Sequence, residues 1–164
     1  MTGAPRVLVF GIGNPARRDD ALGVLLVERI RQYYPSIKVV EEFQLQIENA
    51  LDLRGADLVL FCDAAVGLAH SCKFSEIEPV ASKLAFSHAM PPQALLEVYA
   101  RIQGVAPPPA FALGLRAVSM ELGEGLSAEG AEALEDGWTL ATRLFGTPCL
   151  EAWRRQAQEG FNWI

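Results

Sequence analysis

Residues 7–23 read VLVFGIGNPARRDDALG. The apolar run at 7–10 predicts a strand covered on both faces of a parallel sheet, and the glycines after it predict a tight turn into a helix. Turns of this kind usually bind phosphate, because a helix N-terminus presents free N–H groups to an anion. This turn instead ends in Asp19 and Asp20, whose negative charges repel phosphate. We therefore expect the turn to face a cation or a proton.

The two adjacent carboxylates need separate explanations. Acidic residues are favoured at the N-cap and in the first turn of a helix, because they accept hydrogen bonds from free N–H groups and complement the helix dipole. We expect Asp19 to cap the helix in this way, which leaves Asp20 free at the carboxyl edge of the sheet. The alternative is that both residues are caps with no further role.

The composition indicates a single globular domain. The chain has 164 residues, of which 51% are hydrophobic and 21% are charged, and this is enough to bury a substantial core. Its net charge of -6 argues against a nucleic-acid partner, because such binding draws on clustered Lys and Arg. We find neither an apolar run near the roughly 20 residues of a membrane span nor a signal-peptide pattern.

Cysteine usage fits a reducing compartment. Cys62, Cys72 and Cys149 are odd in number and have no CxxC spacing, which is not the pattern of a disulfide framework or a zinc site. We expect a cytoplasmic monomer that binds neither nucleic acid nor membrane.

Apolar periodicity alternates between strand and helix along the chain. Beyond the first strand, it predicts strands at 37–42, 58–62, 72–79 and 110–120, and the strand at 72–79 is expected at a sheet edge. It predicts helices at 20–34, 47–54, 91–103 and 127–145. This alternation is typical of an α/β fold, and we expect a single-domain three-layer sandwich. Its twisted, mostly parallel sheet should have about five strands with helices on both faces. We assign the domain to residues 1–146 and expect the amphipathic tail, 147–164, to pack on it.

Three titratable residues should meet at the carboxyl edge of this sheet. Asp20 follows the first strand, Asp63 follows the strand at 58–62, and His88 precedes the helix at 91. Ligands of open α/β sheets collect at this edge, and two carboxylates with an imidazole can bind a divalent transition metal or perform acid–base chemistry. The Gly-x-Ser-x-Gly elbow is absent, so hydrolysis would use water. Alternatively, Asp63 caps a turn and His88 is a solvated loop residue.

These residues resemble the hydrogenase maturation proteases, cytoplasmic endopeptidases that trim the C-terminal extension from the large-subunit precursor of nickel-iron hydrogenases once nickel is in place. The resemblance rests on Gly11-x-Gly13-Asn14 followed by Asp19-Asp20-x-x-Gly23, on LVLFCDA at 58–64, and on His88 ahead of the helix bearing Leu95 and Leu96. It extends more diffusely over residues 6 to about 145.

The resemblance implies a site and a partner. Asp20, Asp63 and His88 would be the catalytic and metal-binding trio, which engages the nickel of the hydrogenase precursor transiently, with no tightly held cofactor. Nickel would act as a recognition handle, because the protease makes contacts with the loaded precursor that the empty precursor lacks. The same trio could also activate the attacking water. We place Gly13, Asn14, Glu42 and Gln44 on the substrate-binding side of the site.

One segment departs from the pattern of that family. Its members typically have an Asp-Gly-Gly-Thr turn after the second strand, where this chain has EFQLQ at 42–46. Glu42 can replace the acid, but Phe and Gln cannot replace glycines in a turn of positive φ without changing its path. We expect an altered loop at this edge.

Two other functions remain open from the sequence. Peptidyl-tRNA hydrolases also begin with a strand and Gly-x-Gly-Asn-Pro, but they need a histidine shortly after it and a basic surface for tRNA. A non-catalytic nickel-binding or hydrogenase assembly chaperone could use the same trio for docking.

Overall fold

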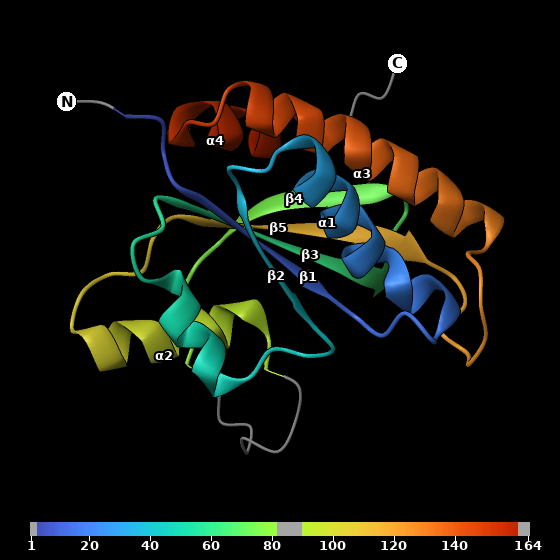
Figure 1. Cartoon of the computed structure of the whole chain (residues 1–164), viewed down its shortest axis with the longest axis horizontal. Helices are drawn as coiled ribbons and strands as arrows, with labels where there is room; N and C mark the ends of the chain where they lie inside the picture. Colours follow the sequence, from blue (N-terminus) through green and yellow to red (C-terminus); the bar gives the residue numbers. More distant parts are fainter. Residues whose placement is uncertain (1–2, 82–89, 161–164) are drawn as a thin grey trace.

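Five strands form one twisted sheet in the order β2-β1-β3-β5-β4 in a computed structural model that describes residues 3–81 and 90–160 (Figure 1). The strands are β1 (Val7–Ile12), β2 (Lys38–Glu42), β3 (Leu58–Val66), β4 (Cys72–Ile77) and β5 (Ala110–Ala117). The pairs of β1 with β2, β1 with β3, and β3 with β5 are parallel, whereas β4 runs antiparallel to β5 at the edge. The predicted mostly parallel five-stranded sheet and its edge strand are confirmed.

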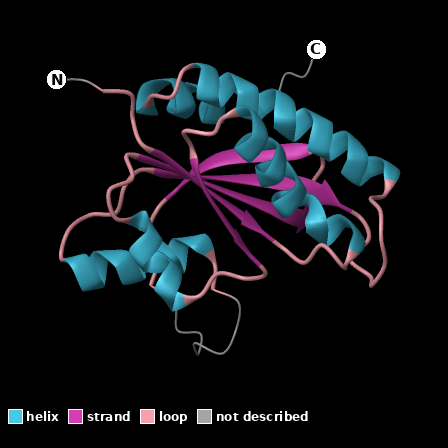
Figure 2. Cartoon of the chain, viewed as in Figure 1, coloured by secondary structure: helices cyan, strands magenta, loops and turns pink. Residues whose placement is uncertain are grey.

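Three α-helices cover one face of the sheet: α1 (Leu22–Tyr33), α3 (Ala128–Gly146) and α4 (Leu150–Glu159). Figure 2 shows them together on one side of the strands. Their buried residues form one apolar cluster with Val9, Leu60 and Cys62 of the central strands. Ser127 caps α3 as predicted, since its side chain accepts a hydrogen bond from the backbone N–H of Gly130.

The opposite face is covered by α2 (Pro92–Gln103) and the 3₁₀ helix η2 (Ile47–Leu53), which lie together below the sheet in Figure 1. Phe10 and Phe61 stack there with ring centroids 4.8 Å apart, inside a second buried cluster. The two clusters on either side of one sheet make the predicted three-layer α/β sandwich. The short helix predicted at 47–54 forms as the tighter 3₁₀ type, over Ile47–Leu53.

The strand β3 is longer than the predicted 58–62. It continues to Val66 because β5 runs beside it as far as Ala117. On its other side, β3 loses its partner earlier, since the last register pair with β1 joins Ile12 to Asp63. Asp63 thus lies within β3, at the point where β1 ends, and not after the strand as predicted.

The segment after α3 forms α4 and lies against the sheet. Trp153 is fully buried, and its indole N–H donates to the carbonyl oxygen of Leu144 over 2.9 Å. The Arg154 guanidinium also holds the Glu76 carboxylate of β4 with two nitrogens. No helix among the described residues is long and apolar enough to cross a membrane.

Candidate functional site

Asp63 lies at the carboxyl edge of the sheet on the α2 side. Side chains alternate between the two faces of a strand, and Phe61 lies in the α2-side cluster whereas Cys62 lies in the opposite one. The alternation therefore places Asp63 on the same face as Phe61, beside Ile12. Ile12, the last residue of β1, is the register partner of Asp63, so the turn after β1 begins beside Asp63.

The environment of Asp63 disfavours its charged form. Burial raises the pKa of Asp63 to about 7, a hydrogen bond from the backbone of Ala64 opposes this, and the nearby Asp20 carboxylate raises it further. A carboxyl group that titrates near neutrality can accept and return a proton at physiological pH. The Asp20 charge contributes to this shift, so the two predicted residues lie close enough to interact electrostatically.

Asp20 is positioned by the turn that follows β1. Its Oδ2 accepts a hydrogen bond from the backbone N–H of Asn14 over 3.1 Å, and its own N–H donates to the Arg17 carbonyl oxygen over 2.9 Å. Gly13 has φ 144°, a conformation open to glycine and strained for other residues. The glycine turn therefore brings the chain back so that Asn14 fixes one carboxylate oxygen of Asp20.

Asp19 does not cap the helix that follows it, so this prediction was wrong. It lies in the 3₁₀ helix η1 (Arg18–Ala21), and neither η1 nor α1 has a side-chain hydrogen bond at its N-cap. The Asp19 side chain is instead fully buried and bonds to residues about a hundred positions later, in the loop before α3. Sequence reasoning missed this role because no local pattern marks such a distant contact.

The four predicted substrate-binding residues divide into two kinds. Gly13 and Asn14 shape the loop: the Gly13 N–H donates to the Glu42 carbonyl oxygen over 2.9 Å, and Asn14 Oδ1 accepts from the N–H of Ala16. Glu42 is half-buried at the end of β2, and Gln44 is exposed. The Glu42 carboxylate accepts a hydrogen bond from the Asn49 side-chain amide over 3.2 Å.

An open groove of about 360 Å³ adjoins this loop. Its walls carry acidic and apolar groups from the β1 turn, α1 and the end of β2: Gly13, Pro15, Val24, Glu28, Glu41, Glu42 and Phe43. Phe43 is 72% exposed, in the segment at 42–46 where an altered loop was predicted. Groove and exposed aromatic ring together form a surface that could receive a polypeptide.

His88, the third member of the predicted trio, lies outside the described residues. Within residues 3–81 and 90–160, no group of three His, Cys, Asp or Glu side chains is arranged to hold a metal ion. The described part of the site is thus a pair of carboxylates. Met90, two positions after His88, packs against the α2-side cluster that contains Phe10 and Phe61.

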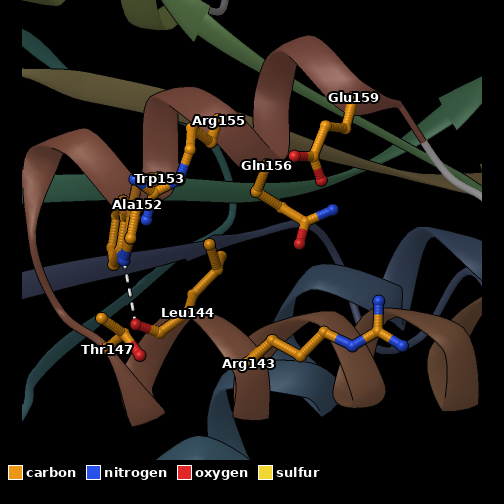
Figure 3. Close-up of a pocket in the computed structure, with 8 residues that line it drawn as sticks. All are labelled: Arg143, Leu144, Thr147, Ala152, Trp153, Arg155, Gln156 and Glu159. Atoms are coloured by element: carbon orange, nitrogen blue, oxygen red, sulfur yellow. Dashed lines mark hydrogen bonds between the residues drawn. The ribbon is translucent and has the colours of Figure 1, made fainter.

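A second hollow, of about 210 Å³, lies between α3 and α4, away from the carboxylate pair. Figure 3 shows Trp153 at one wall, with its hydrogen bond to Leu144, and the polar side chains of Gln156 and Glu159 further along α4. This region has a structural role, since the hydrogen bond from Trp153 to Leu144 joins α4 to the end of α3.

The fold was compared with solved structures. The hydrogenase maturating endopeptidase HybD from E. coli superposes with a TM-score of 0.68 at 22% identity, covering 87% of this chain and 93% of HybD. The [NiFe] hydrogenase maturation protease HycI from Thermococcus kodakarensis gives 0.65 at 23% identity, covering 89% and 96%. A hydrogenase 2 maturation peptidase from a Thaumarchaeota archaeon gives 0.62 at 21%, covering 86% and 98%.

This chain has the fold of the hydrogenase maturation proteases. The resemblance drawn from the sequence is confirmed at the level of the fold, over nearly the whole length of those proteins. No protein-family model and no curated protein matched the sequence.

Proposed function

We propose that this protein is an endopeptidase that removes a C-terminal extension from the large-subunit precursor of a nickel-iron hydrogenase. One observation supports the proposal above all. Asp20 and Asp63 come together where β1 ends, on a fold shared with proteins named as hydrogenase maturation endopeptidases. Ligands of open α/β sheets bind at this edge.

The carboxylate pair supports hydrolysis by water. With a pKa of about 7, Asp63 is partly ionised at neutral pH. As a general base, it would accept a proton from water as the water oxygen attacks the scissile carbonyl carbon, and then return that proton to the departing amine. Asp20 keeps one oxygen bonded to Asn14, so its carboxylate is oriented before substrate binds.

The same pair could instead hold the nickel of the precursor. Carboxylate oxygens and a histidine nitrogen are suitable ligands for a divalent transition metal, and we propose that Asp20, Asp63 and His88 contact nickel transiently as part of the substrate. A bound cation next to both carboxylates would favour their ionised forms. Nickel-loaded precursor would therefore bind better than empty precursor, which makes cleavage the last step after metal insertion.

We propose that the precursor chain enters along the groove beside Gly13 and Glu42, with Asn14 and Gln44 at its margin. The groove carries three glutamates and the exposed Phe43 ring, so it suits a segment that combines positive charge with apolar side chains. Asn14 would act through the Asp20 carboxylate that it orients.

We also place the protein in the cytoplasm, as a monomer with no cofactor of its own. Cys62, Cys72 and Cys149 are free thiols, and the first two are buried. Burial raises the pKa of Cys72 to about 12, which keeps this thiol protonated and unreactive at neutral pH. Free cysteines of this kind are typical of a reducing compartment.

The test is cleavage of purified precursor, with and without nickel, followed as a shift of the large subunit on a gel. Asp20→Asn, Asp63→Asn and His88→Ala should each lower the cleavage rate by about 100-fold or more. Asp136→Asn and His70→Ala are matched controls that remove the same chemical groups elsewhere and should cleave normally. Asp136 bonds Ser71, and His70 is exposed in a turn.

Three results would count against the proposal. Normal cleavage by all three variants would contradict the assignment of the site. Cleavage of nickel-free precursor at the same rate as nickel-loaded precursor would contradict nickel recognition. A stable complex with loaded precursor and no shortened product would indicate an assembly chaperone.

A further inference from the structure

Two segments about a hundred residues apart in sequence lie side by side at the carboxyl edge of the sheet and are joined by hydrogen bonds. The turn at 16–20 follows β1, and the loop at 118–127 joins β5 to α3. Two backbone bonds tie Gly123 to the turn: its carbonyl oxygen accepts from the N–H of Arg18 over 3.1 Å, and its N–H donates to the Ala16 carbonyl oxygen over 3.0 Å. The Arg17 Nε also donates to the Met120 carbonyl oxygen over 3.0 Å.

The Asp19 carboxylate lies at the centre of this junction. Its Oδ2 accepts from the backbone N–H groups of Val118 and Ser119 over 2.9 and 3.1 Å, and from the Ser127 hydroxyl over 2.7 Å. Its Oδ1 accepts from the Ser127 N–H over 2.8 Å. The same Ser127 hydroxyl caps α3. One buried carboxylate thus satisfies four donors on the far side of the junction.

These bonds keep Asp19 charged although it is buried. Burial by itself raises the pKa of Asp19, but the hydrogen bonds from Ser127, Val118 and Ser119 outweigh it and leave the pKa below its ordinary value. Buried ionised groups require such compensation. The bonds are charge-assisted, and bonds of that kind are about twice as strong as neutral ones.

The backbone just before the two aspartates is conformationally constrained. Arg18 has φ 45°, the one positive value among non-glycine residues of the described chain. A residue in this region is strained and keeps that conformation only when its surroundings fix it. Asp19 and its backbone N–H, which donates to the Ser119 carbonyl oxygen over 2.9 Å, supply that fixation on one side. On the other side, Asp20 turns toward Asn14.

We propose that Asp19 is a positioning residue that acts through Asp20. By tying the turn at 16–20 to the loop at 118–127, it fixes the strained backbone at Arg18 and so directs the Asp20 carboxylate to Asn14 and to the edge where Asp63 lies. It has no surface exposure through which it could touch a substrate. Its effect on cleavage rests on the proposed endopeptidase function, whereas its effect on the geometry of Asp20 does not.

The variant Asp19→Asn removes the charge and one acceptor oxygen of this side chain but keeps its size. An amide has one acceptor oxygen in place of two, so its NH₂ group would face N–H or O–H donors of the loop and could not replace all four bonds. We therefore expect the junction to loosen while the sheet remains intact. Asp136→Asn is the matched control, because Asp136 also accepts a bond from a distant residue, Ser71, but lies away from this edge.

The first measurement is amide hydrogen exchange of Asn14 by NMR on the full chain, under conditions where unfolding curves show each variant to be folded. The Asn14 N–H reports directly on the Asp20 carboxylate that accepts its hydrogen bond. We expect its protection to fall by about tenfold or more in Asp19→Asn and to stay unchanged in Asp136→Asn. Unchanged Asn14 protection in a folded Asp19→Asn protein overturns the proposal, whatever the cleavage assay shows.

The second measurement is precursor cleavage in a double-mutant cycle. Asp19→Asn and Asp20→Asn should change the same kinetic constant, and the double variant should be no slower than Asp20→Asn alone, because residues that act through one another are not additive. Additive losses would overturn an action through Asp20. If the wild-type protein does not cleave at all, the proposed function fails, and the exchange measurement still decides the role of Asp19.

A milder variant covers the case in which Asp19→Asn does not fold. Ser127→Ala keeps the Asp19 carboxylate and removes only its hydroxyl donor. We expect a smaller loss of Asn14 protection, in the same direction. Full protection in folded Ser127→Ala together with an unfolded Asp19→Asn would reduce Asp19 to a purely structural residue and overturn the proposal.

Discussion

Replacing Asp63 by asparagine should abolish a specific pH dependence of folding stability. Burial raises the pKa of Asp63 from an ordinary value of 3.8 to about 7 in the folded protein. The folded state then binds more protons than the unfolded state between about pH 4 and pH 7. The contribution of Asp63 to the free energy of unfolding is therefore highest below pH 4, decreases as the pH rises to 7, and stays constant above. The difference between the two pKa values corresponds to at most about 4 kcal/mol.

The assay is urea unfolding of metal-free protein, in buffer with a chelator, at intervals from pH 4 to pH 8. The asparagine side chain in Asp63→Asn is neutral throughout, so the stability of this variant relative to wild type should rise by up to about 4 kcal/mol across this range. Taking the difference between the two proteins removes the contributions of groups that titrate equally in both. Asp136→Asn, which removes a carboxylate away from the edge, should show no comparable rise over the same interval.

A flat difference between wild type and Asp63→Asn from pH 4 to pH 8 would refute the reasoning. It would mean that Asp63 is solvated in the folded protein and ionises in its ordinary range. Asp63 could then not serve as a proton acceptor and donor at neutral pH. A role as a nickel ligand would not be affected, because that role does not depend on a raised pKa.

The remaining predictions concern stability. Trp153→Ala should lower the free energy of unfolding, measured in urea, by about 3–5 kcal/mol, because it empties a fully buried site. If Trp153→Ala lost no more stability than Trp153→Phe, packing of the aromatic ring would not be what holds α4. Gly23→Ala should destabilise strongly, because a Cβ would approach the Ile12 carbonyl oxygen to 2.5 Å; thermal melting would contradict this if Gly146→Ala, where space is open, were equally harmful. Below about pH 4, the wild-type protein should lose stability as Asp19 is protonated, because the pKa of this carboxyl group is lower in the folded protein than in the unfolded one. Asp19→Asn lacks this group, so its free energy of unfolding should fall less over the same range. An acid titration identical to that of wild type would contradict this prediction.

Local patterns were sufficient to predict most elements of the fold. The apolar runs of β1 and β3 and the helical spacing of α1, α2 and α3 depend on residues close in sequence, and the observed elements begin within a few residues of the predicted ones. The edge position of β4 followed from its alternating pattern. The end of β3 was missed because it depends on how far β5 runs beside it, and pairing between distant strands leaves no mark in a local window.

The candidate site was predicted in part, for the same reason. Asp20 lies in the turn after β1, and Asp63 lies in β3 beside the last residue of β1. The carboxyl ends of neighbouring parallel strands meet at one edge, so the fold class alone predicts that the two residues lie near each other. The strands β1 and β3 are adjacent in the sheet, as this reasoning requires. The placement of His88 stays a prediction, and so does the role of the segment at 42–46.

The stretch at 7–23 determined by itself that a buried strand turns through glycines into a helix and presents two carboxylates, because apolar runs, glycine and charge act locally. It predicted Asp20 as the free carboxylate, but it could not determine what engages Asp19, which does not cap the following helix. Only the tertiary structure decided that, by bringing the loop at 118–127 against the turn so that four donors surround Asp19. Asp20 remains for chemistry because its neighbour is fully engaged by residues a hundred positions away.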